Sequence, residues 1–478
     1  MALRSTPRAV ALLAAPVLAA TLLGAGHAAA DASTIGSDGY VHVAPNGVVL
    51  GVDPYYPKDG NGGYDVSDYT LALDYSPYWG TLRGKATIKA VTTQDLSRFN
   101  LDLRGMTVRS VRVNGAPAAF ARVGEHELVI TPSALLPSGA DFTVEVGYDG
   151  VPRPLYTSRG WTGWVDTGDS AVAMGAPRAA MTWFPVNGTE VDKATMHVAV
   201  TVPTGWSVVG NGVQASDVPG SGRHTVTWAE ETPLAPHATM LGIGRWQLDT
   251  ITLADGTKAV NAYGPCALGL RAVGNRLPEV REFLDPLLWG YPQSASGTLF
   301  LDRNTAYTHG AQGRPVLGAN ATVEDLVYAT AYQWWGASLT HKMWKDVLLV
   351  EGFSRYAVWL WDEAKNGVDL DARYRGLVER GDAAFWARRL IDPGAGREFA
   401  PTTKAVLMVH ALRKTLGDDL FFQVMAGFPI INQQGNQNWH DWELYVDAVA
   451  QRELTGFYHA WLEGAVIPPA EFLYPTAP

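Results

Sequence analysis

The sequence predicts a multidomain α+β protein, in which an N-terminal antiparallel all-β domain precedes a mainly helical domain. Three observations predict this fold class. The chain has 478 residues, which is enough for two or three domains. Residues 66–246 contain alternating or β-rich runs between turns of glycine, proline and asparagine. After Ala267, apolar residues instead recur at helical spacing over long stretches.

The composition is that of a packed globular protein. Hydrophobic residues make up 47% of the chain and charged residues 18%, which argues against disorder. The formal net charge is −10, and the sequence contains no block of lysine and arginine. Because non-specific nucleic-acid binding needs a basic surface, we expect no nucleic-acid partner.

Residues 1–30 have the features of a secretory signal peptide. Arg4 and Arg8 give a positive start, residues 9–25 are apolar, and Ala28–Ala30 offers a cleavage site of small residues. The alternative is an uncleaved membrane anchor, but Pro16 interrupts the run and the run is short for a spanning helix. We therefore expect a secreted, extracellular protein with no membrane span after signal cleavage.

The first predicted domain covers residues 31–246. Its β-rich runs are 69–75, 81–93, 107–113, 127–130, 141–148, 196–202, 206–209, 224–228 and 238–243. Before them, residues 59–65 (DGNGGYD) superficially suggest a calcium loop. They lack the spacing and the closing glutamate of an EF-hand, so we expect an ordered turn.

The second predicted domain covers residues 247–478. A strand is expected over 297–301. Helices are expected over 267–289, 325–335, 343–365 and 369–390. A further helix begins at about 401, and a pair of helices follows over 416–464. Gly336 supplies the stop of the helix over 325–335. The only cysteine, Cys266, has no partner for an internal disulfide, and we expect it to be a buried small hydrophobic residue.

Two short motifs in this domain bear on function. Residues 333–336 read Q-W-W-G and residues 351–353 read E-G-F. Tyr328 and Tyr332 are four residues apart, so both project from one face of the first helix. Eighteen residues separate Tyr332 from Glu351, which we place on the following helix.

The two motifs and the spacing between them resemble the zinc site of the aminopeptidase N-like family of gluzincin metallopeptidases. That site has the pattern H-E-x-x-H-Q-W-x-G followed by N-E-G-F. The resemblance implies that Tyr328 stands in place of the first zinc histidine, Ala329 in place of the general-base glutamate, and Tyr332 in place of the second histidine. Glu351 keeps the place of the third ligand. It also implies a thermolysin-like helical domain over 247–478, after a β-sandwich or saddle over 31–246.

Other motifs extend the resemblance along nearly the whole mature chain. Thr182–Pro185 (TWFP), followed by Asp192-Lys-Ala, resembles the junction of the β and catalytic domains. Gly310, Ala311, Gln312 and Gly313 stand where the family has the substrate-binding G-x-M-E, so Gly313 replaces the glutamate that grips the substrate amine. Thr402 occupies the place of the tyrosine that stabilises the oxyanion.

The substitutions at these positions argue against zinc hydrolysis. Catalytic zinc takes three protein ligands, and a phenol, with a pKa near ~10, is a poor one at neutral pH. The Ala329 methyl cannot accept a proton. We therefore expect no cofactor and a catalytically inactive homologue that retains a cleft for a peptide or protein ligand. The alternatives are an active zinc aminopeptidase with substitute ligands, another hydrolase that uses the same cleft, or a cell-surface protein-interaction module.

Without zinc, the Glu351 carboxylate needs hydrogen-bond donors. We expect the hydroxyl of Tyr328, of Tyr332 or of both to supply them. A rival hypothesis is that both tyrosines and Glu351, with His309 or His341, bind another metal such as ferric iron. Otherwise His309, His341 and His410 are expected to be packed or surface histidines.

Overall fold

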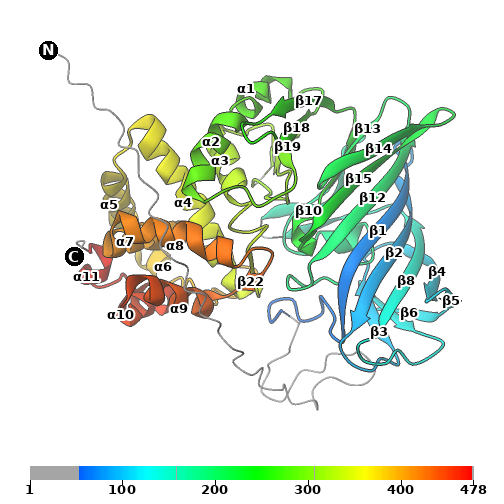
Figure 1. The fold of residues 1–478 in the computed structure, drawn as a ribbon, viewed down its shortest axis with the longest axis horizontal. Helices are drawn as coiled ribbons and strands as arrows, with labels where there is room; N and C mark the ends of the chain where they lie inside the picture. Colours follow the sequence, from blue (N-terminus) through cyan, green and yellow to red (C-terminus); the bar gives the residue numbers. More distant parts are fainter. Residues whose placement is uncertain (1–52, 158, 306, 476–478) are drawn as a thin grey trace.

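The structure is a computed structural model that describes residues 53–157, 159–305 and 307–475. A β-rich domain, from β1 (Tyr64–Ser76) to β16 (Leu241–Gly244), lies beside a mainly helical domain that begins with β17 (Gln247–Thr252) (Figure 1). The predicted α+β fold class is confirmed. In the described ranges, no helix combines the length and apolar character needed to cross a membrane. The predicted signal peptide, residues 1–30, lies outside the described residues.

The largest sheet of the first domain has eight strands in the order β14-β15-β12-β1-β2-β8-β4-β5. Their bounds are β2 (Thr81–Thr92), β4 (Thr107–Val113), β5 (Ala116–Pro117), β8 (Asp141–Gly150), β12 (Ala194–Pro203), β14 (Val213–Pro219) and β15 (Arg223–Leu234). β1 and β12 pair in parallel, with Leu71 opposite Val198. The prediction of a purely antiparallel domain is therefore wrong at this pair. The two strands are far apart in the chain, and only such a long crossover permits a parallel pair.

Two smaller sheets complete the first domain. One has five strands in the order β13-β16-β11-β10-β9, and the other has three in the order β3-β7-β6. Their bounds are β3 (Phe99–Asp102), β6 (Ala119–Val123), β7 (Glu127–Thr131), β9 (Pro154–Thr157), β10 (Gly160–Asp166), β11 (Ser170–Met174) and β13 (Ser207–Gly210). The strict alternation of buried positions in β12 shows that the large sheet covers a core with one face. Trp164, Trp183 and Trp228 are buried in that core.

The second domain combines a four-stranded sheet with helices. The sheet runs β17-β18-β19-β20, with β18 (Lys258–Tyr263), β19 (Ser296–Phe300) and β20 (Val316–Leu317) parallel to one another. The helices are α1 (Arg271–Gly274), α2 (Leu277–Leu287), α3 (Val323–Ala331), α4 (Val347–Asn366), α5 (Leu370–Arg380), α6 (Ala383–Trp386), α7 (Thr402–Leu416), α8 (Asp418–Ile431), α9 (Trp439–Ala450), α10 (Thr455–Tyr458) and α11 (Ala470–Leu473). A short pair of strands, β21 (Thr340–His341) and β22 (Asn436–Gln437), links the α3–α4 connection to the chain before α9.

Two predicted long helices are each broken in the structure. The run 267–289 is divided into α1 and α2, because Pro278 lacks an N–H group and favours the first turn of a new helix. The run 369–390 is divided into α5 and α6, where the Asp382 side chain accepts a hydrogen bond from the Phe385 N–H and caps a new start. Apolar residues recur at helical spacing across both breaks, so the sequence pattern alone did not reveal them.

Helices α3 and α4 position the residues of the two motifs. Thr322 and Asp325 form a reciprocal capping box that fixes the start of α3. The helix ends at Ala331, four residues before the predicted end, and turns lead on to Gly336. The rings of Trp335 and Phe353 stack with their centroids 4.1 Å apart, so the Q-W-W-G motif after α3 packs directly against the E-G-F motif on α4.

Cys266 is exposed, so the prediction that it is buried is wrong. It lies in the surface turn that follows β18, where its backbone N–H donates a hydrogen bond of 2.7 Å to the Asp302 carboxylate. The composition of the sequence around a lone cysteine does not reveal whether a turn carries it to the surface.

Residues 53–63 form a strap that contacts both domains. On the helical side, the Tyr55 hydroxyl donates to Asp392 at 2.5 Å and the Tyr56 hydroxyl donates to Glu398. On the β side, Asp59 pairs with Arg178, and the Gly60 N–H donates to Asp102 at 2.8 Å. The strap therefore ties the two domains together.

Candidate functional site

The predicted site lies where α3 packs against α4. The Tyr328 hydroxyl donates hydrogen bonds to both carboxylate oxygens of Glu351, at 3.0 Å and 3.1 Å. Both residues are buried, with exposed fractions of 3% and 2%. The predicted hydrogen bond between a motif tyrosine and Glu351 is thus confirmed for Tyr328.

Two arginines complete the surroundings of Glu351. The Arg355 Nε donates a hydrogen bond of 2.9 Å to the carboxylate, and a terminal nitrogen of Arg159 forms an ion pair at 3.6 Å. Burial opposes ionisation of Glu351, but the charges of Arg355 and Arg159, with the hydrogen bonds, outweigh it and lower its pKa. Glu351 is therefore held as a carboxylate.

Arg159 reaches this site from the other domain. It directly precedes β10, in the connection from β9, and the guanidinium lies between two aromatic rings, 4.1 Å from the centroid of Tyr307 and 3.9 Å from that of Phe399. Its side chain is 13% exposed. Two guanidinium groups thus face one carboxylate, which leaves an excess of positive charge at this point of the domain interface.

Tyr332 projects from the same face of α3 but does not join Glu351. Its hydroxyl lies 3.3 Å from Nε2 of His237, and Nδ1 of His237 bonds to the buried carboxylate of Glu190. A β-carbon added at Gly310 or at Gly336 would lie 2.2 Å or 2.3 Å from the Tyr332 ring. The ring is therefore held against two glycine backbones. Of the two tyrosines, Tyr328 alone forms the hydrogen bond to Glu351 that we predicted for one or both.

The remaining predicted catalytic positions contribute no acid or base. Ala329 is fully buried in the hydrophobic core of the second domain. Thr402 is the first residue of α7, and its hydroxyl donates to the Phe399 carbonyl at 2.6 Å. That bond holds the short hydroxyl at the start of its own helix.

The predicted substrate-binding residues Gly310, Ala311, Gln312 and Gly313 are all buried. The Gln333 side chain donates to the Ala311 carbonyl at 3.1 Å and accepts from the Gly313 N–H at 2.7 Å. The Gln312 N–H donates to the Ala238 carbonyl at 3.0 Å. The glutamine of the Q-W-W-G motif thus fixes this segment against α3, and a role of the segment in substrate binding stays a prediction.

Among the described residues, neither His309 nor His341, the histidines considered for metal binding, forms a hydrogen bond or ion pair with Glu351. His309 and His341 are both buried, and the ring of His341 is centred 5.6 Å from that of His237. Burial, with the nearby His237 and Arg159, lowers the pKa of His309 to about 3, so it is neutral. His410 is also buried and bonds to Tyr356 and Asp371. The prediction that these are packed histidines is confirmed.

The side chains at the predicted metal position do not fit zinc. Burial and the charge of Glu351 raise the pKa of Tyr328 well above its usual value, and the same two causes raise that of Tyr332. A protonated phenol is a poor ligand, and two guanidinium groups would repel a dication beside Glu351. A ferric ion would need ionised phenols as ligands and would meet the same two guanidinium groups, so these side chains fit it poorly as well.

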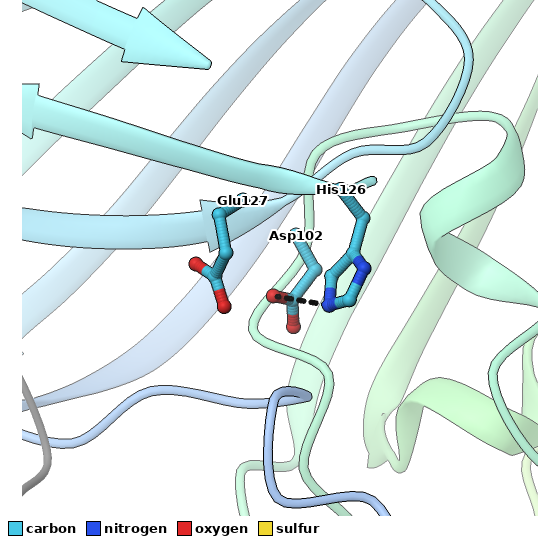
Figure 2. Close-up of side chains that lie close together, drawn as sticks. All are labelled: Asp102, His126 and Glu127. Carbon is cyan, nitrogen blue, oxygen red and sulfur yellow. Dashed lines mark ion pairs between the residues drawn. The ribbon is translucent and has the colours of Figure 1, made fainter. Parts of the chain in front are cut away.

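A second cluster of ionisable side chains, two buried and one half-buried, was not foreseen from the sequence. Figure 2 shows Asp102, His126 and Glu127, whose potential ligand atoms lie within 4.8 Å of one another. His126 Nε2 lies 2.8 Å from the Lys58 carbonyl and 3.1 Å from Asp59, both in the strap. Since Nε2 must carry a proton to bond a carbonyl, it is not free to bind a metal.

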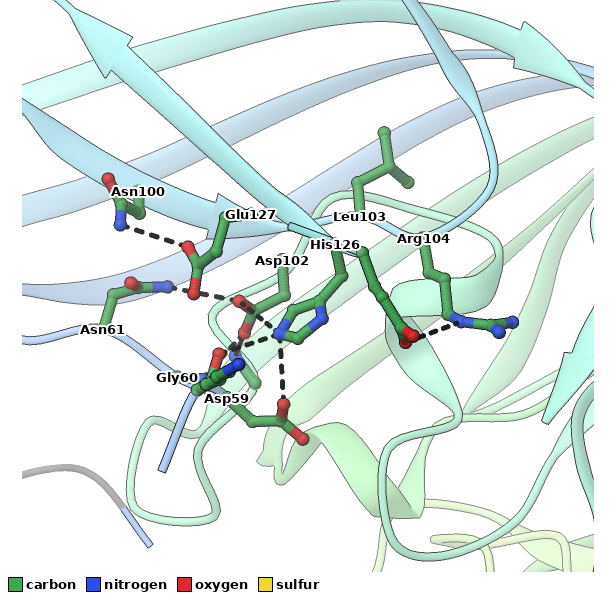
Figure 3. Close-up of polar contacts among 12 residues, drawn as sticks. Asp59, Gly60, Asn61, Asn100, Asp102, Leu103, Arg104, His126 and Glu127 are labelled. Carbon is green, nitrogen blue, oxygen red and sulfur yellow. Dashed lines mark hydrogen bonds and ion pairs between the residues drawn. The ribbon is translucent and has the colours of Figure 1, made fainter. Parts of the chain in front are cut away.

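Hydrogen bonds also hold the carboxylates of this cluster. Asp102 accepts from the backbone N–H groups of Gly60 and Gly188, and Glu127 accepts from Asn100 at 3.1 Å (Figure 3). Arg178 donates to Asp59 at 2.8 Å, and His126 lies 3.1 Å from Asp59 and 4.0 Å from Asp102. We therefore interpret the cluster as the anchor of the strap, in agreement with the ordered turn predicted for residues 59–65.

Comparison with known proteins supports the fold. An M1 zinc metallopeptidase from Deinococcus radiodurans has a TM-score of 0.79 at 22% identity, over 87% of this chain and 97% of that chain. A point mutant of it, bound to the substrate Tyr-Ser-Ala, has a TM-score of 0.78 at 23% identity, over 87% and 98%. Aminopeptidase A of Legionella pneumophila, in complex with aspartic acid, has a TM-score of 0.73 at 16% identity, over 84% and 50%. No family model and no curated protein matches the sequence. The chain has the two-domain fold of M1 zinc metallopeptidases, as the resemblance predicted.

Proposed function

We propose that this chain, which has the fold of M1 zinc metallopeptidases, is a catalytically silent homologue that binds a peptide or protein ligand and does not cleave it. The observation that carries the proposal is the environment of Glu351. Tyr328, Arg355 and Arg159 satisfy its carboxylate, so the group that binds zinc in the resembled family is committed to contacts within the chain.

The lack of a general base supports the same conclusion. Hydrolysis of a peptide bond needs a group that takes a proton from water, and the buried Ala329 has none. Thr402, in place of the oxyanion tyrosine, donates its hydroxyl to Phe399. Two catalytic roles are thus missing in addition to the metal.

The charge of the site favours a particular ligand. A free peptide amine needs a carboxylate, but Glu351 is already paired and Gly313 offers no side chain. The partly exposed Arg159, held between Tyr307 and Phe399, suits a ligand carboxylate. The ligand is therefore a peptide bound through an acidic side chain or a free carboxyl terminus.

The proposal also includes export of the protein. The positive start, apolar run and small-residue site over residues 1–30 support a cleaved signal and an extracellular location. N-terminal sequencing of protein from the culture medium of a producing bacterium tests this part, and a chain that retains residue 1 would contradict it.

Two assays test the proposal that the protein binds a peptide and does not cleave it. The purified protein is mixed with a panel of aminoacyl-anilides, and binding of peptide libraries with free and with amidated carboxyl termini is measured by calorimetry. We expect no turnover, and binding that weakens at least about tenfold in Arg159→Gln and in amidated peptides that also lack acidic side chains. Chelator-sensitive turnover of any anilide would overturn the proposed inactivity, and equal binding of amidated peptides without acidic side chains would overturn recognition through a carboxylate.

A further inference from the structure

A second candidate binding surface lies on the β domain, away from Glu351. It is a groove of about 680 Å³ between the β1–β2 turn, the chain before β9, and strand β10, and the second domain contributes Arg303. The side chains that matter most here are Tyr78, Trp79, Arg153, Trp161, Asp166 and Arg303. Its volume lies within the range of about 300–1,000 Å³ that is typical of ligand sites.

The aromatic residues at this groove are unusually exposed. Trp79 is 69% exposed and Trp161 58%. Each has an exposed tyrosine at its side, with ring centroids 4.5 Å apart for Tyr78 and Trp79, and 5.1 Å apart for Tyr156 and Trp161. Both pairs are edge-to-face, so each tryptophan is braced by a neighbour. Exposed apolar rings gathered in one place mark an interaction site.

The charge at the groove is opposite to that of the chain as a whole. Arg153 and Arg303 are exposed, and neither forms an ion pair with another described side chain. Asp166, the carboxylate among the lining residues, accepts hydrogen bonds of 2.8 Å from the Tyr75 hydroxyl and from the Gly168 N–H. The groove therefore presents two free guanidinium groups beside flat aromatic faces.

We propose that this groove binds an oligosaccharide that carries carboxylate groups. The apolar C–H face of a sugar ring stacks on the negative face of an indole, and Arg153 and Arg303 can pair with sugar carboxylates in the bidentate manner of arginine. An amphipathic helix lays its apolar face into a hydrophobic groove, whereas this groove carries two guanidinium groups and a carboxylate. The proposal does not depend on the inactivity of the Glu351 site.

Calorimetry with defined oligosaccharides tests the proposal on the full mature chain. The probes are hexagalacturonate, an alginate hexamer and a hyaluronan hexasaccharide, and neutral maltohexaose is the uncharged comparison. We expect at least one acidic probe to bind, and Trp79→Ala or Trp161→Ala to weaken it about tenfold. Arg153→Gln combined with Arg303→Gln should remove the preference for acidic over neutral sugar.

Trp289→Ala is the matched control, because Trp289 is 57% exposed on the other domain. It should leave the affinity unchanged. Hexaglutamate and vesicles of phosphatidylglycerol are run in parallel. Failure of all three acidic sugars to bind would overturn the proposal, as would binding only to hexaglutamate, binding only to vesicles, or an equal loss of affinity in Trp289→Ala.

Discussion

The Tyr328 hydroxyl donates hydrogen bonds of 3.0 Å and 3.1 Å to the two oxygens of the Glu351 carboxylate. A phenol on one helix thereby supplies the hydrogen-bond donor that a buried carboxylate on the next helix requires. Arg355 and Arg159 add the positive charge. Hydrogen bonds and ion pairs from side chains of the same chain therefore satisfy the Glu351 carboxylate.

Tyr328→Phe should destabilise the protein by about 1–3 kcal/mol, because it removes a hydrogen bond to a buried charged group and leaves the ring in place. Urea unfolding followed by circular dichroism measures the change. Tyr332→Phe is the control on the same helix face, since its hydroxyl bonds to His237 at 3.3 Å and faces no buried carboxylate directly. An equal loss in the two variants would show that Tyr328 has no special role at Glu351.

Glu351→Ala should cost more, about 3–5 kcal/mol, because it leaves two guanidinium groups at a buried interface without their partner. Adding Arg159→Ala and Arg355→Ala to this variant should recover part of the loss, since the unpaired charges are then removed. Thermal or urea unfolding gives the change in free energy of unfolding for Glu351→Ala, for the two arginine substitutions together, and for all three combined. A strictly additive series would contradict the idea that these side chains form one cluster.

Gly310→Ala should destabilise the protein by about 1–3 kcal/mol through overpacking, because its new methyl would lie 2.2 Å from the Tyr332 ring. The φ angle of Gly310 is not in the left-handed region, so the effect is steric and not a backbone effect. Adding Tyr332→Ala should reduce the cost of the Gly310 change. The same cost in both backgrounds would show that the ring does not set the requirement for glycine.

The strap anchor should depend on pH through His126. Burial opposes its protonation, but the bonds to Asp59 and to the Lys58 carbonyl and the charge of Asp102 raise its pKa from 6.5 to about 9. Its contribution is therefore fully present below pH 6.5 and is lost as the pH rises through about 9. Burial and the charges of Glu127 and Asp59 raise the pKa of Asp102 from 3.8 to about 7. Its contribution to stability is therefore also lost as the pH rises, but between pH 3.8 and about 7.

His126→Gln, which cannot titrate, isolates this contribution from those of other groups. Its cost in free energy of unfolding should be about 1–2 kcal/mol at pH 6 and clearly smaller at pH 9.5. Parallel urea titrations of both proteins across this range measure the difference. A cost that is constant with pH would contradict a charged His126 in the anchor.

The sequence was sufficient for the fold class and for the partners on the motif helices. The spacing from Gln333 to Phe353 indicated two packed helices, and the Trp335–Phe353 stack shows the contact. Arg355 follows Glu351 by four residues on one helix, so its ion pair could have been predicted from spacing alone. Local periodicity carries this kind of information.

Contacts between distant segments could not be predicted in the same way. Arg159 belongs to the β domain, and no motif marks it as a partner of Glu351. The parallel pairing of β1 with β12 and the bond from Tyr332 to His237 are also long-range. The contacts of Arg159 and Tyr332 depend on how the two domains pack, and the β1–β12 pair joins strands that are far apart in the chain of one domain. The local pattern of a single sequence encodes neither.

The zinc content of the purified protein tests the central claim most directly. The protein is incubated with equimolar zinc, desalted and analysed by elemental mass spectrometry, beside a variant that combines Tyr328→His, Ala329→Glu, Tyr332→His and Arg159→Ala. We predict far less than one zinc per unmodified chain, and retention of zinc by the variant, in which the missing ligands are restored and one repelling charge is removed. One zinc retained per unmodified chain, with chelator-sensitive hydrolysis of an aminoacyl-anilide, would contradict the account.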